Sequence, residues 1–221
     1  MYDDDGNLWD EDPPPLEVEV KYLPNPLLLK QDQTAFGLGG RLWPGSEVLI
    51  RHIADNQELL AHCHSIVELG SGTGAVGIAI SALLSLTAGS QDHRVVVTDL
   101  ENLVPLLEAN IGLNGTSQHV RAAPLFWGTG AATELASELG GFADAVVMAD
   151  VAYTPSAHGA LADTLETLSC SKTLVLHTHL PRHPPGTGEA FCEELGRRGW
   201  TTEELPSIDR VKVWRHWPPQ S

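Results

Sequence analysis

A glycine-rich segment at residues 68–77 (ELGSGTGAVG) offers the strongest chemical signal in the sequence. It follows a short apolar run and leads into a stretch with helical spacing of apolar residues. The alternating Gly70, Gly72 and Gly74 let the backbone turn sharply and approach a ligand with no Cβ in the way. In an open α/β sheet such a turn lies at the carboxyl edge of the strands, where small molecules bind. The segment therefore predicts a ligand-binding loop.

Two ligands compete for this loop. Residues 72–77 (GTGAVG) match the GxGxxG pattern of dinucleotide-binding loops, and Asp99 ends the next predicted strand, where an acid would accept both ribose hydroxyls. Glu68, however, places a carboxylate directly before the loop, where it would repel a pyrophosphate and attract a cation. S-adenosylmethionine carries a sulfonium and an ammonium and no phosphate, so the charge favours this molecule over NAD. A glycine-rich turn without any ligand is the third interpretation.

Each of these acids also has a purely structural interpretation. Glu68 either faces the ammonium of the ligand, directly or through water, or orders the glycine loop by accepting backbone N–H groups. Asp99 either accepts the ribose hydroxyls or caps a helix that starts near Asn102.

Asp150 and Tyr153 follow residues 144–149 (DAVVMA), a strongly apolar predicted strand, so they belong to the same edge of the sheet. A carboxylate there can hold a cation, and a phenol can border a channel and accept a hydrogen bond. Methyl transfer from a sulfonium to an amine is an in-line displacement that depends mostly on proximity and alignment. An amine that arrives protonated must first lose its proton. The structural alternative for Asp150 is the N-cap of a helix that begins near Pro155.

Two tryptophans lie close to these motifs. Trp127 follows a predicted strand in a loop bounded by proline and glycine, which favours a ligand contact such as packing on adenine. Trp43 precedes the Pro44-Gly45 pair that opens a helix, and it either contacts the ligand or anchors that helix to the sheet.

The histidines and cysteines do not predict a metal site. His177, His179 and His183 are close in the sequence, but no cysteine, aspartate or glutamate lies near them to complete a zinc site. The three cysteines are scattered and form no CxxC pair, which argues against a disulfide framework or a zinc knuckle. We therefore expect no bound metal.

The elements that must position these residues alternate between strand and helix. Helices are expected at residues 43–60, 75–88, 103–114, 131–139, 157–168 and 188–198, and strands at 65–69, 94–98, 119–123, 144–149, 173–177, 200–205 and 211–217. The alternation predicts a three-layer, Rossmann-like α/β domain with a seven-stranded, mostly parallel sheet. The last two strands follow each other around a turn at residues 206–210, so they form a hairpin with one antiparallel strand.

The charge of the chain is strongly acidic and unevenly placed. The 221 residues carry a net charge of −16, and residues 1–20 hold eight of the 29 acidic side chains and no lysine or arginine. We expect residues 1–22 to be a disordered acidic leader and residues 23–221 to be a single domain, with residues 16–29 offering an edge strand. The acid excess argues against nucleic acid as a partner.

Two further classes of protein are unlikely on the sequence alone. No apolar run approaches the roughly 20 residues that cross a bilayer, so a membrane partner is not expected, and the acidic N-terminus is the reverse of a signal peptide. We expect a cytoplasmic protein, with the nucleus as an alternative, and a monomer.

Five short motifs, in order along the chain, resemble a known family. They are residues 39–43 (GGRLW), 68–74 (ELGSGTG), 95–114 (VVVTDLENLVPLLEANIGLN), 125–128 (LFWG) and 150–153 (DVAY). Together they are similar to the class I, seven-stranded S-adenosylmethionine-dependent methyltransferases, and within these to the methyltransferase-like 21 group (family 16) of protein-lysine methyltransferases. The resemblance runs from residue 36 to residue 180.

The resemblance implies methyl transfer from S-adenosylmethionine to a lysine of a protein, with S-adenosylhomocysteine as the product. Elongation factors and chaperone-type ATPases are the first substrate classes it suggests. It implies that Asp150 and Tyr153 line the opening for the lysine. The residues it assigns to the cofactor are Trp43, Glu68, Gly70, Gly72, Gly74, Asp99, Leu100, Trp127 and Ala149.

The chain departs from this family at residues 177–183, where members often carry a Tyr-Glu-x-Arg-like segment. Arg182 matches the arginine, but the acidic partner is missing, so the acceptor protein stays open. Three other functions compete: a methyltransferase of the same fold that acts on a small molecule or another nucleophile, an NAD-dependent oxidoreductase, and a binding module without turnover.

Overall fold

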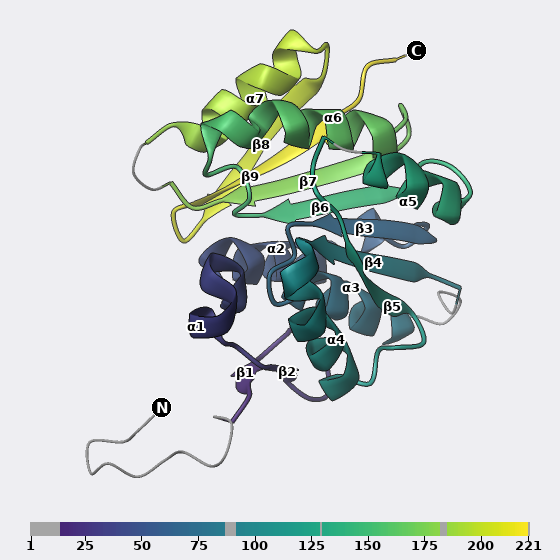
Figure 1. The fold of residues 1–221 in the computed structure, drawn as a ribbon, viewed down its shortest axis with the longest axis vertical. Helices are drawn as coiled ribbons and strands as arrows, with labels where there is room; N and C mark the ends of the chain where they lie inside the picture. Colours follow the sequence, from purple (N-terminus) through teal and green to yellow (C-terminus); the bar gives the residue numbers. More distant parts are fainter. Residues whose placement is uncertain (1–13, 87–91, 129, 182–184, 221) are drawn as a thin grey trace.

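The β-branched and apolar runs of the sequence form the centre of a seven-stranded sheet (Figure 1). The computed structural model describes residues 14–86, 92–128, 130–181 and 185–220. The strands of the sheet are β3 (Ser65–Leu69), β4 (Arg94–Asp99), β5 (Val120–Pro124), β6 (Ala145–Ala149), β7 (Leu174–His179), β8 (Thr201–Ile208) and β9 (Val211–Trp217).

The strand order is β5-β4-β3-β6-β7-β9-β8. Strands β3 to β7 are parallel to one another, and β9 runs antiparallel to both β7 and β8. This topology confirms the predicted mostly parallel sheet with a C-terminal antiparallel hairpin. Because β3 lies between β4 and β6, the segments that follow these three strands meet at one edge of the sheet.

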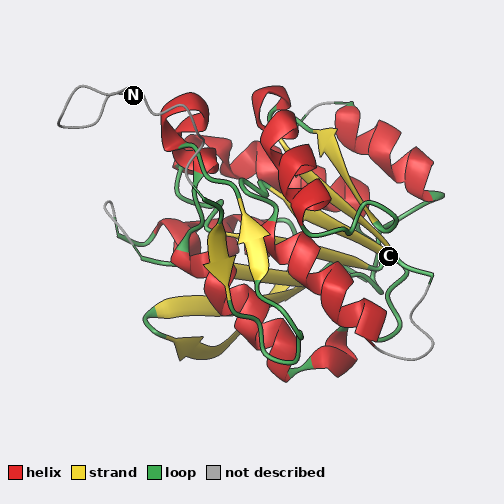
Figure 2. Cartoon of the chain, turned by 90° about the horizontal axis from the view of Figure 1, so that it is seen from below, coloured by secondary structure: helices red, strands yellow, loops and turns green. Residues whose placement is uncertain are grey.

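Helices cover both faces of the sheet (Figures 1 and 2). The main helices are α2 (Pro44–Asp55), α3 (Ala75–Leu86), α4 (Val104–Leu113), α5 (Ala131–Leu139), α6 (His158–Leu168) and α7 (Thr187–Arg197). Apolar residues of α2, α3 and α4 pack on one face, around strand residues such as Ile66 and Val147. Those of α5, α6 and α7 pack on the other, around Val67 and Met148. The alternation of side chains along each strand therefore supplies both cores.

The N-terminal segment adds a small antiparallel pair of strands, β1 (Leu16–Val18) and β2 (Leu27–Leu29). Residues 1–13 of the predicted leader lie outside the described residues. Its last part differs from the prediction, because β1 is a strand and Val20 is buried in the core of the α2–α4 face. The folded chain in this structure therefore begins before residue 22.

The short helices complete the connections between the larger elements. They are α1 (Gln33–Phe36), η1 (Gly37–Gly40), η2 (Gln57–Leu59), η3 (Glu101–Leu103) and η4 (Pro155–Ala157). The helix expected over residues 43–60 ends at Asp55, and η2 follows it. Among the described residues, no helix is long and apolar enough to span a membrane.

The C-terminal turn is shorter than predicted. Strand β8 continues through Pro206 to Ile208, with an irregular register after Leu205, and the chain turns at Asp209 and Arg210. Both turn residues have positive φ angles, 51° and 68°. The interpretation of Pro206 as a turn residue was wrong because β8 is an edge strand, where a missing N–H removes no ladder hydrogen bond.

Candidate functional site

The glycine-rich loop connects β3 to α3 at the carboxyl edge of the sheet. Gly70, Gly72 and Gly74 all have positive φ angles of 64°, 55° and 77°. Space is also restricted here, because a Cβ on Gly70 would lie 2.6 Å from Val151 Cγ1 and one on Gly72 would lie 3.0 Å from the Gly39 carbonyl oxygen. The loop thus needs glycine both for its backbone conformation and for the close approach of its neighbours.

Glu68 lies beneath this loop and binds its helix. The side chain is buried, and Oε2 accepts a hydrogen bond from the Gly77 N–H in the first turn of α3 at 2.8 Å. Burial raises the pKa of Glu68 to about 8, and the hydrogen bond from Gly77 opposes this rise. This geometry supports the structural alternative for Glu68, in which the carboxylate orders the loop through backbone N–H groups. Contact with a ligand ammonium stays a prediction.

Asp99, at the end of β4, also contacts the loop. Its Oδ2 accepts a hydrogen bond from the Gly72 N–H at 2.7 Å, and its Oδ1 accepts one from the Leu100 N–H at 2.8 Å. Burial raises the pKa of Asp99, while these two hydrogen bonds lower it. Each carboxylate oxygen has a second lone pair, so Asp99 can still accept hydroxyl groups of a bound ligand.

The other motifs surround the same loop. A Cβ on Gly70 would meet Trp127 Cζ2 at 3.2 Å as well as Val151, so the loops after β5 and β6 both pack against the loop after β3. The η1 segment contributes Gly39, which faces Gly72. Four sequence motifs that are far apart in the chain therefore converge at one edge of the sheet.

Trp43 is the N-cap residue of α2. Its Nε1 donates a hydrogen bond to the Leu38 carbonyl oxygen at 2.8 Å, and the Arg41 guanidinium lies over the ring, 4.6 Å from its centroid. These contacts fix the orientation of the indole at the junction of η1 and α2. Neither contact is with the sheet, so the cofactor contact and the anchoring of α2 to the sheet both stay predictions.

Asp150 has a different structural role from the one considered in the sequence. Its Oδ2 accepts a hydrogen bond from the Gly45 N–H at the start of α2, and its Oδ1 accepts one from the Leu180 N–H, both at 2.8 Å. The side chain is buried, and the backbone has a φ angle of 57°. Asp150 therefore links the ends of β6 and β7 to the N-terminus of α2, rather than capping η4, whose N-cap Thr154 makes no side-chain cap bond.

The remaining predicted site residues differ in exposure. Tyr153 and Leu100 are exposed, by 44% and 47%, whereas Ala149 is buried at the end of β6. Two residues that the sequence did not single out as ligands, Leu38 and Phe126, are exposed beside the same motifs. Large exposed apolar side chains at a rim are typical of a surface that meets another molecule. The signal available in the sequence was their position: Phe126 lies inside the motif at residues 125–128, and Leu38 directly precedes the motif at residues 39–43.

The histidine segment lies only partly within the described residues. His177 and His179 are buried in β7, and the Nδ1 atom of His179 lies 4.0 Å from Asp150 Oδ1. His183 and Arg182, the residue aligned with the family's arginine, lie outside the described residues.

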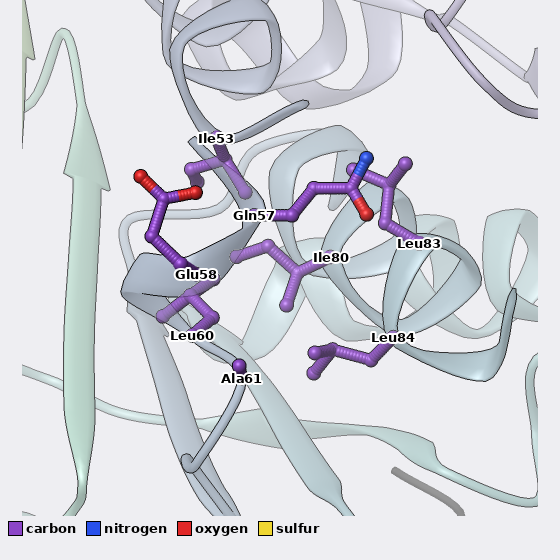
Figure 3. A pocket seen from close by; sticks show the side chains of 8 residues that line it. All are labelled: Ile53, Gln57, Glu58, Leu60, Ala61, Ile80, Leu83 and Leu84. Carbon is purple, nitrogen blue, oxygen red and sulfur yellow. The ribbon is translucent and has the colours of Figure 1, made fainter. Parts of the chain in front are cut away.

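A cavity of about 180 Å³ is found elsewhere, between α2, η2 and α3 (Figure 3). Its lining is mostly apolar and includes Ile53, Leu60 and Leu84. The connections that lead into β3 and out of α3 border it, so it lies toward the amino edge of the sheet and not at the site described above.

Comparison with known proteins agrees with the resemblance seen in the sequence. Residues 22–196 match the family model described as lysine methyltransferase. The protein-lysine N-methyltransferase EFM6 of Saccharomyces cerevisiae is 32% identical over 152 residues, which cover 63% of this chain and 61% of the yeast protein. The protein N-lysine methyltransferase METTL21A of Danio rerio is 32% identical over 173 residues, which cover 77% of this chain and 72% of that protein.

Solved structures share the fold at low sequence identity. An O-methyltransferase family protein from Burkholderia thailandensis has a TM-score of 0.58 at 12% identity, covering 79% of this chain and 58% of that one. The cofactor-bound Rv0187 protein from MTB has a TM-score of 0.55 at 14% identity, covering 82% and 83%. These structures confirm the Rossmann-like methyltransferase fold. Because the family model matches most of the chain and its motifs meet at one edge of the sheet, this chain belongs to the lysine methyltransferase family.

Proposed function

We propose that this protein transfers a methyl group from S-adenosylmethionine to a lysine side chain of a protein substrate. The observation that carries the proposal is the convergence of the glycine loop, Asp99, Trp127 and the segment after β6 at one edge of the sheet. Membership in the lysine methyltransferase family supplies the expected class of acceptor.

The residues at this edge fit the proposed donor. The glycine loop exposes backbone without a Cβ at Gly70, Gly72 and Gly74, all at positive φ, and Asp99 presents carboxylate oxygens beside it. Glu68 adds a second acid directly beneath the loop. The Asp99 carboxylate suits a ligand that carries positive charge and no phosphate, and it would repel a pyrophosphate. Glu68, whose pKa is raised to about 8, adds a hydrogen-bonding group beneath the loop and not a full negative charge near pH 7.

The donor, when bound, would supply a methyl group on a sulfonium sulfur: the amine would form a bond to the methyl carbon in line with the breaking C–S bond, and the thioether S-adenosylhomocysteine would leave. For this the chain must hold a neutral lysine amine in line with the methyl group. We assign Tyr153, exposed at the rim, to border the path of the lysine side chain. Asp150 contributes mainly by fixing α2 and the end of β7, because its side chain is buried and both of its oxygens accept backbone N–H groups.

The first experiment tests the donor. Purified protein is titrated by calorimetry with S-adenosylhomocysteine and, separately, with NAD. We expect saturable binding of S-adenosylhomocysteine that is weakened at least tenfold in Asp99→Asn, with the exposed Glu108→Gln variant as the matched control. Binding of NAD without binding of S-adenosylhomocysteine would overturn the proposal in favour of an oxidoreductase.

The second experiment tests the acceptor. The protein is incubated with donor labelled in the methyl group and with a cell extract, and the labelled residue is mapped by mass spectrometry. Label on a lysine of a protein supports the proposal, and elongation factors and chaperone-type ATPases are the first purified substrates to try. Label on small molecules or arginine alone would favour another nucleophile, and binding without any labelling would favour a module without turnover.

The proposal also covers the domain bounds, the oligomeric state, the compartment and the partners of the enzyme. We take residues 23–221 as the catalytic domain, and we expect a monomer in the cytoplasm with no nucleic acid or membrane partner. Sedimentation of the purified chain tests the monomer, and fractionation of cells that make the protein tests the compartment. A stable dimer in sedimentation would contradict the monomer.

A further inference from the structure

A cluster of metal-binding side chains lies apart from the cofactor loop, between the C-terminal strands and α7. It consists of His177 on β7, Cys192 on α7 and His216 on β9, and one ligand atom from each lies within 4.8 Å of the other two. The α7 residue Phe191 packs beside both histidine rings, with centroids 5.6 Å from His177 and 6.4 Å from His216. The three residues are far apart in the sequence, so only the fold brings them together.

The histidines of this cluster have ring nitrogens without hydrogen-bond partners. Both ring nitrogens of His177 and the Nε2 of His216 are buried and unpartnered among the described residues. The other nitrogen of His216, Nδ1, lies 2.8 Å from Thr202 Oγ1, which orients the ring. Buried polar atoms in folded proteins nearly always have a partner, so three unpartnered nitrogens in one place call for a specific cause.

Packing alone does not supply that cause. The rings of His177 and His216 are stacked at 5.7 Å, and His177 meets Trp214 at 5.1 Å, which accounts for the burial of the rings. An apolar side chain would pack there equally well and leave no unpaired nitrogen.

The donor atoms of the cluster suit a metal ion. Imidazole nitrogen and cysteine sulfur are ligands that zinc binds in proteins. Both imidazole rings are buried, and neutral imidazole is the form that binds metals.

We propose that His177, Cys192 and His216 bind one zinc ion. Three atoms within 4.8 Å of one another all lie within about 2.8 Å of a common point, so side-chain shifts of about 0.5–0.8 Å reach zinc–ligand bonds of about 2.0–2.3 Å. On binding, the S–H bond of Cys192 breaks, its proton passes to solvent, and the thiolate electron pair forms the bond to zinc. The half-buried Cys192 provides the side of the cluster through which the ion reaches it.

The charge of such a site is small. Two neutral imidazoles and one thiolate leave a net charge of +1 on the complex. The Glu189 carboxylate, one turn before Cys192 on α7, acts on the thiol electrostatically and also has a buried oxygen, Oε2, without a hydrogen-bond partner among the described residues. Glu189 would therefore offset part of that charge from outside the ligand set.

The role of this zinc would be to hold three elements together. It would join β7, β9 and α7 at a point two residues before His179, while Thr178, next to His177, donates a hydrogen bond to the Gly45 carbonyl oxygen in α2 at 2.8 Å. The ion would thus stabilise the C-terminal half of the sheet without contacting the cofactor loop. The inference does not depend on the proposed function.

The test uses the full chain, freed of metal with a chelator and titrated with cobalt as a spectroscopic substitute for zinc. We expect one equivalent of cobalt to produce a cobalt–thiolate charge-transfer band in the wild type and in the control variants Cys170→Ser and Cys63→Ser, whose cysteines are also half-buried. The band should be lost in Cys192→Ser. Absence of the band in the wild type, or its persistence in Cys192→Ser, would overturn the proposal.

Two further measurements test zinc binding on the wild type alone. Zinc at about one hundred times its Kd should raise Tm by about 5–10 °C. Zinc should also slow alkylation of Cys192 at least about tenfold while leaving Cys170 unchanged, as followed by peptide mass spectrometry. An unchanged Tm together with unprotected Cys192 would show that the cluster binds water or nothing, and would overturn the proposal.

Discussion

At the scale of single residues, Glu68 makes stability depend on pH. Its pKa is about 8 in the folded chain and about 4.5 when exposed, so the folded state holds this proton more tightly than the unfolded state. The free energy of unfolding should therefore fall as the pH rises from about 4.5 to about 8, at up to about 1.4 kcal/mol for each unit of pH. Denaturant unfolding of the wild type at several pH values measures this slope.

The Glu68→Gln variant isolates the contribution of this residue. Its amide oxygen can still accept the Gly77 N–H, but it does not titrate, so the slope between pH 4.5 and 8 should become shallower. Asp99, whose pKa is also raised, contributes in the same direction and stays in the variant. Equal slopes in the wild type, Glu68→Gln and the exposed control Glu108→Gln would contradict the assignment.

Asp150 predicts an ordered series of variants. Asp150→Asn keeps one acceptor oxygen and tolerates the positive φ angle, whereas Asp150→Ala loses both acceptors and suits that backbone conformation poorly. We expect Asp150→Asn to lose about 1 kcal/mol of stability and Asp150→Ala about 3 kcal/mol. Thermal and denaturant unfolding measure the series, and a fully stable Asp150→Ala would show that the two hydrogen bonds do not hold α2.

Sequence reasoning located the site residues better than it assigned their roles. The glycine loop, Asp99 and Asp150 were placed at one edge because each follows a predicted parallel strand. The partner of Asp150 could not be predicted, because Gly45 lies 105 residues away and its contact depends on how α2 packs. The cluster at His177 could not be predicted for the same reason, because its other members lie on α7 and β9 and come together only in the fold.

At the scale of elements, α4 holds the N-terminal segment in place through two asparagines one turn apart. The buried Asn110 accepts the Lys30 N–H at 2.7 Å and donates to the carbonyl oxygens of Lys30 and Thr73, at 3.1 and 2.9 Å. Asn114 pairs in the same way with both backbone groups of Leu28. The two amide side chains form hydrogen bonds with the backbone of residues 28 and 30, as a neighbouring strand would. Asn110 also connects this segment to the glycine loop through Thr73.

Loss of the Asn110 amide should release this segment. Asn110→Ala leaves the Lys30 backbone groups and the Thr73 carbonyl oxygen without this partner, so we expect a loss of about 3 kcal/mol in stability. Limited proteolysis should cut faster within residues 20–32. The exposed Asn102→Ala on η3 serves as the control, and equal cleavage of both variants would contradict this role of Asn110.

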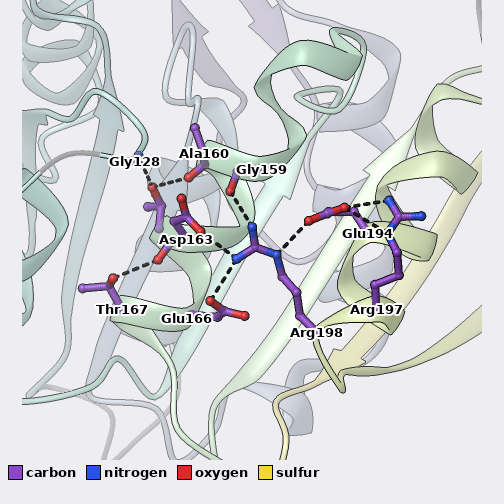
Figure 4. A network of polar contacts seen from close by, with 10 residues as sticks. Gly128, Gly159, Ala160, Asp163, Glu166, Thr167, Glu194, Arg197 and Arg198 are labelled. Carbon is purple, nitrogen blue, oxygen red and sulfur yellow. Dashed lines mark hydrogen bonds and ion pairs between the residues drawn. The ribbon is translucent and has the colours of Figure 1, made fainter.

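Arg198 joins two helices at the opposite face of the sheet (Figure 4). Its guanidinium donates to Glu194 at 2.8 Å on α7, and to Asp163 at 2.6 Å and Glu166 at 3.0 Å on α6. The neighbouring Arg197 contacts Glu194 on its own helix instead. Arg197 is therefore a matched control for Arg198, because its ion pair lies within α7 and does not reach α6.

Arg198→Ala should cost about 1–2 kcal/mol, because it removes a partly buried network between helices, while Arg197→Ala should cost less than about 0.5 kcal/mol. Raising the ionic strength should shrink the difference, since salt screens these pairs. Denaturant unfolding of both variants at low and high salt checks this. Equal costs at low salt would contradict a bridge between α6 and α7.

The regular elements were predictable because their patterns are strong. Strands β3 and β9 have the predicted bounds, since each has a clear run of apolar residues, and the weaker pattern of α5 also gave its bounds because glycines lie on both sides of it. Strand β1 was harder to predict, because its residues Leu16 and Glu17 are exposed and its pairing depends on the turn at residues 21–26. Tertiary pairing, and not local preference, determines such an element.

At the scale of the whole molecule, the acid excess predicts electrostatic attraction of a basic protein substrate. The net charge of −16 is shared about equally between residues 1–20 and the rest of the chain. The kcat/KM on a basic lysine-containing protein should fall as ionic strength rises, because salt screens long-range attraction. A neutral lysine peptide is the control, and a salt-insensitive rate on the protein would contradict steering.

The position of β9 has a consequence for the order in which the chain can fold during synthesis. Strand β9 lies between β7 and β8, and it is the only strand that pairs with β8 among the described residues. Strand β8 therefore has no partner until residues 211–217 join the sheet, and the outer part of the sheet stays incomplete until then. The newly made chain must protect an unpaired edge during this interval, and stalling within the last turn would leave β7 exposed at its side.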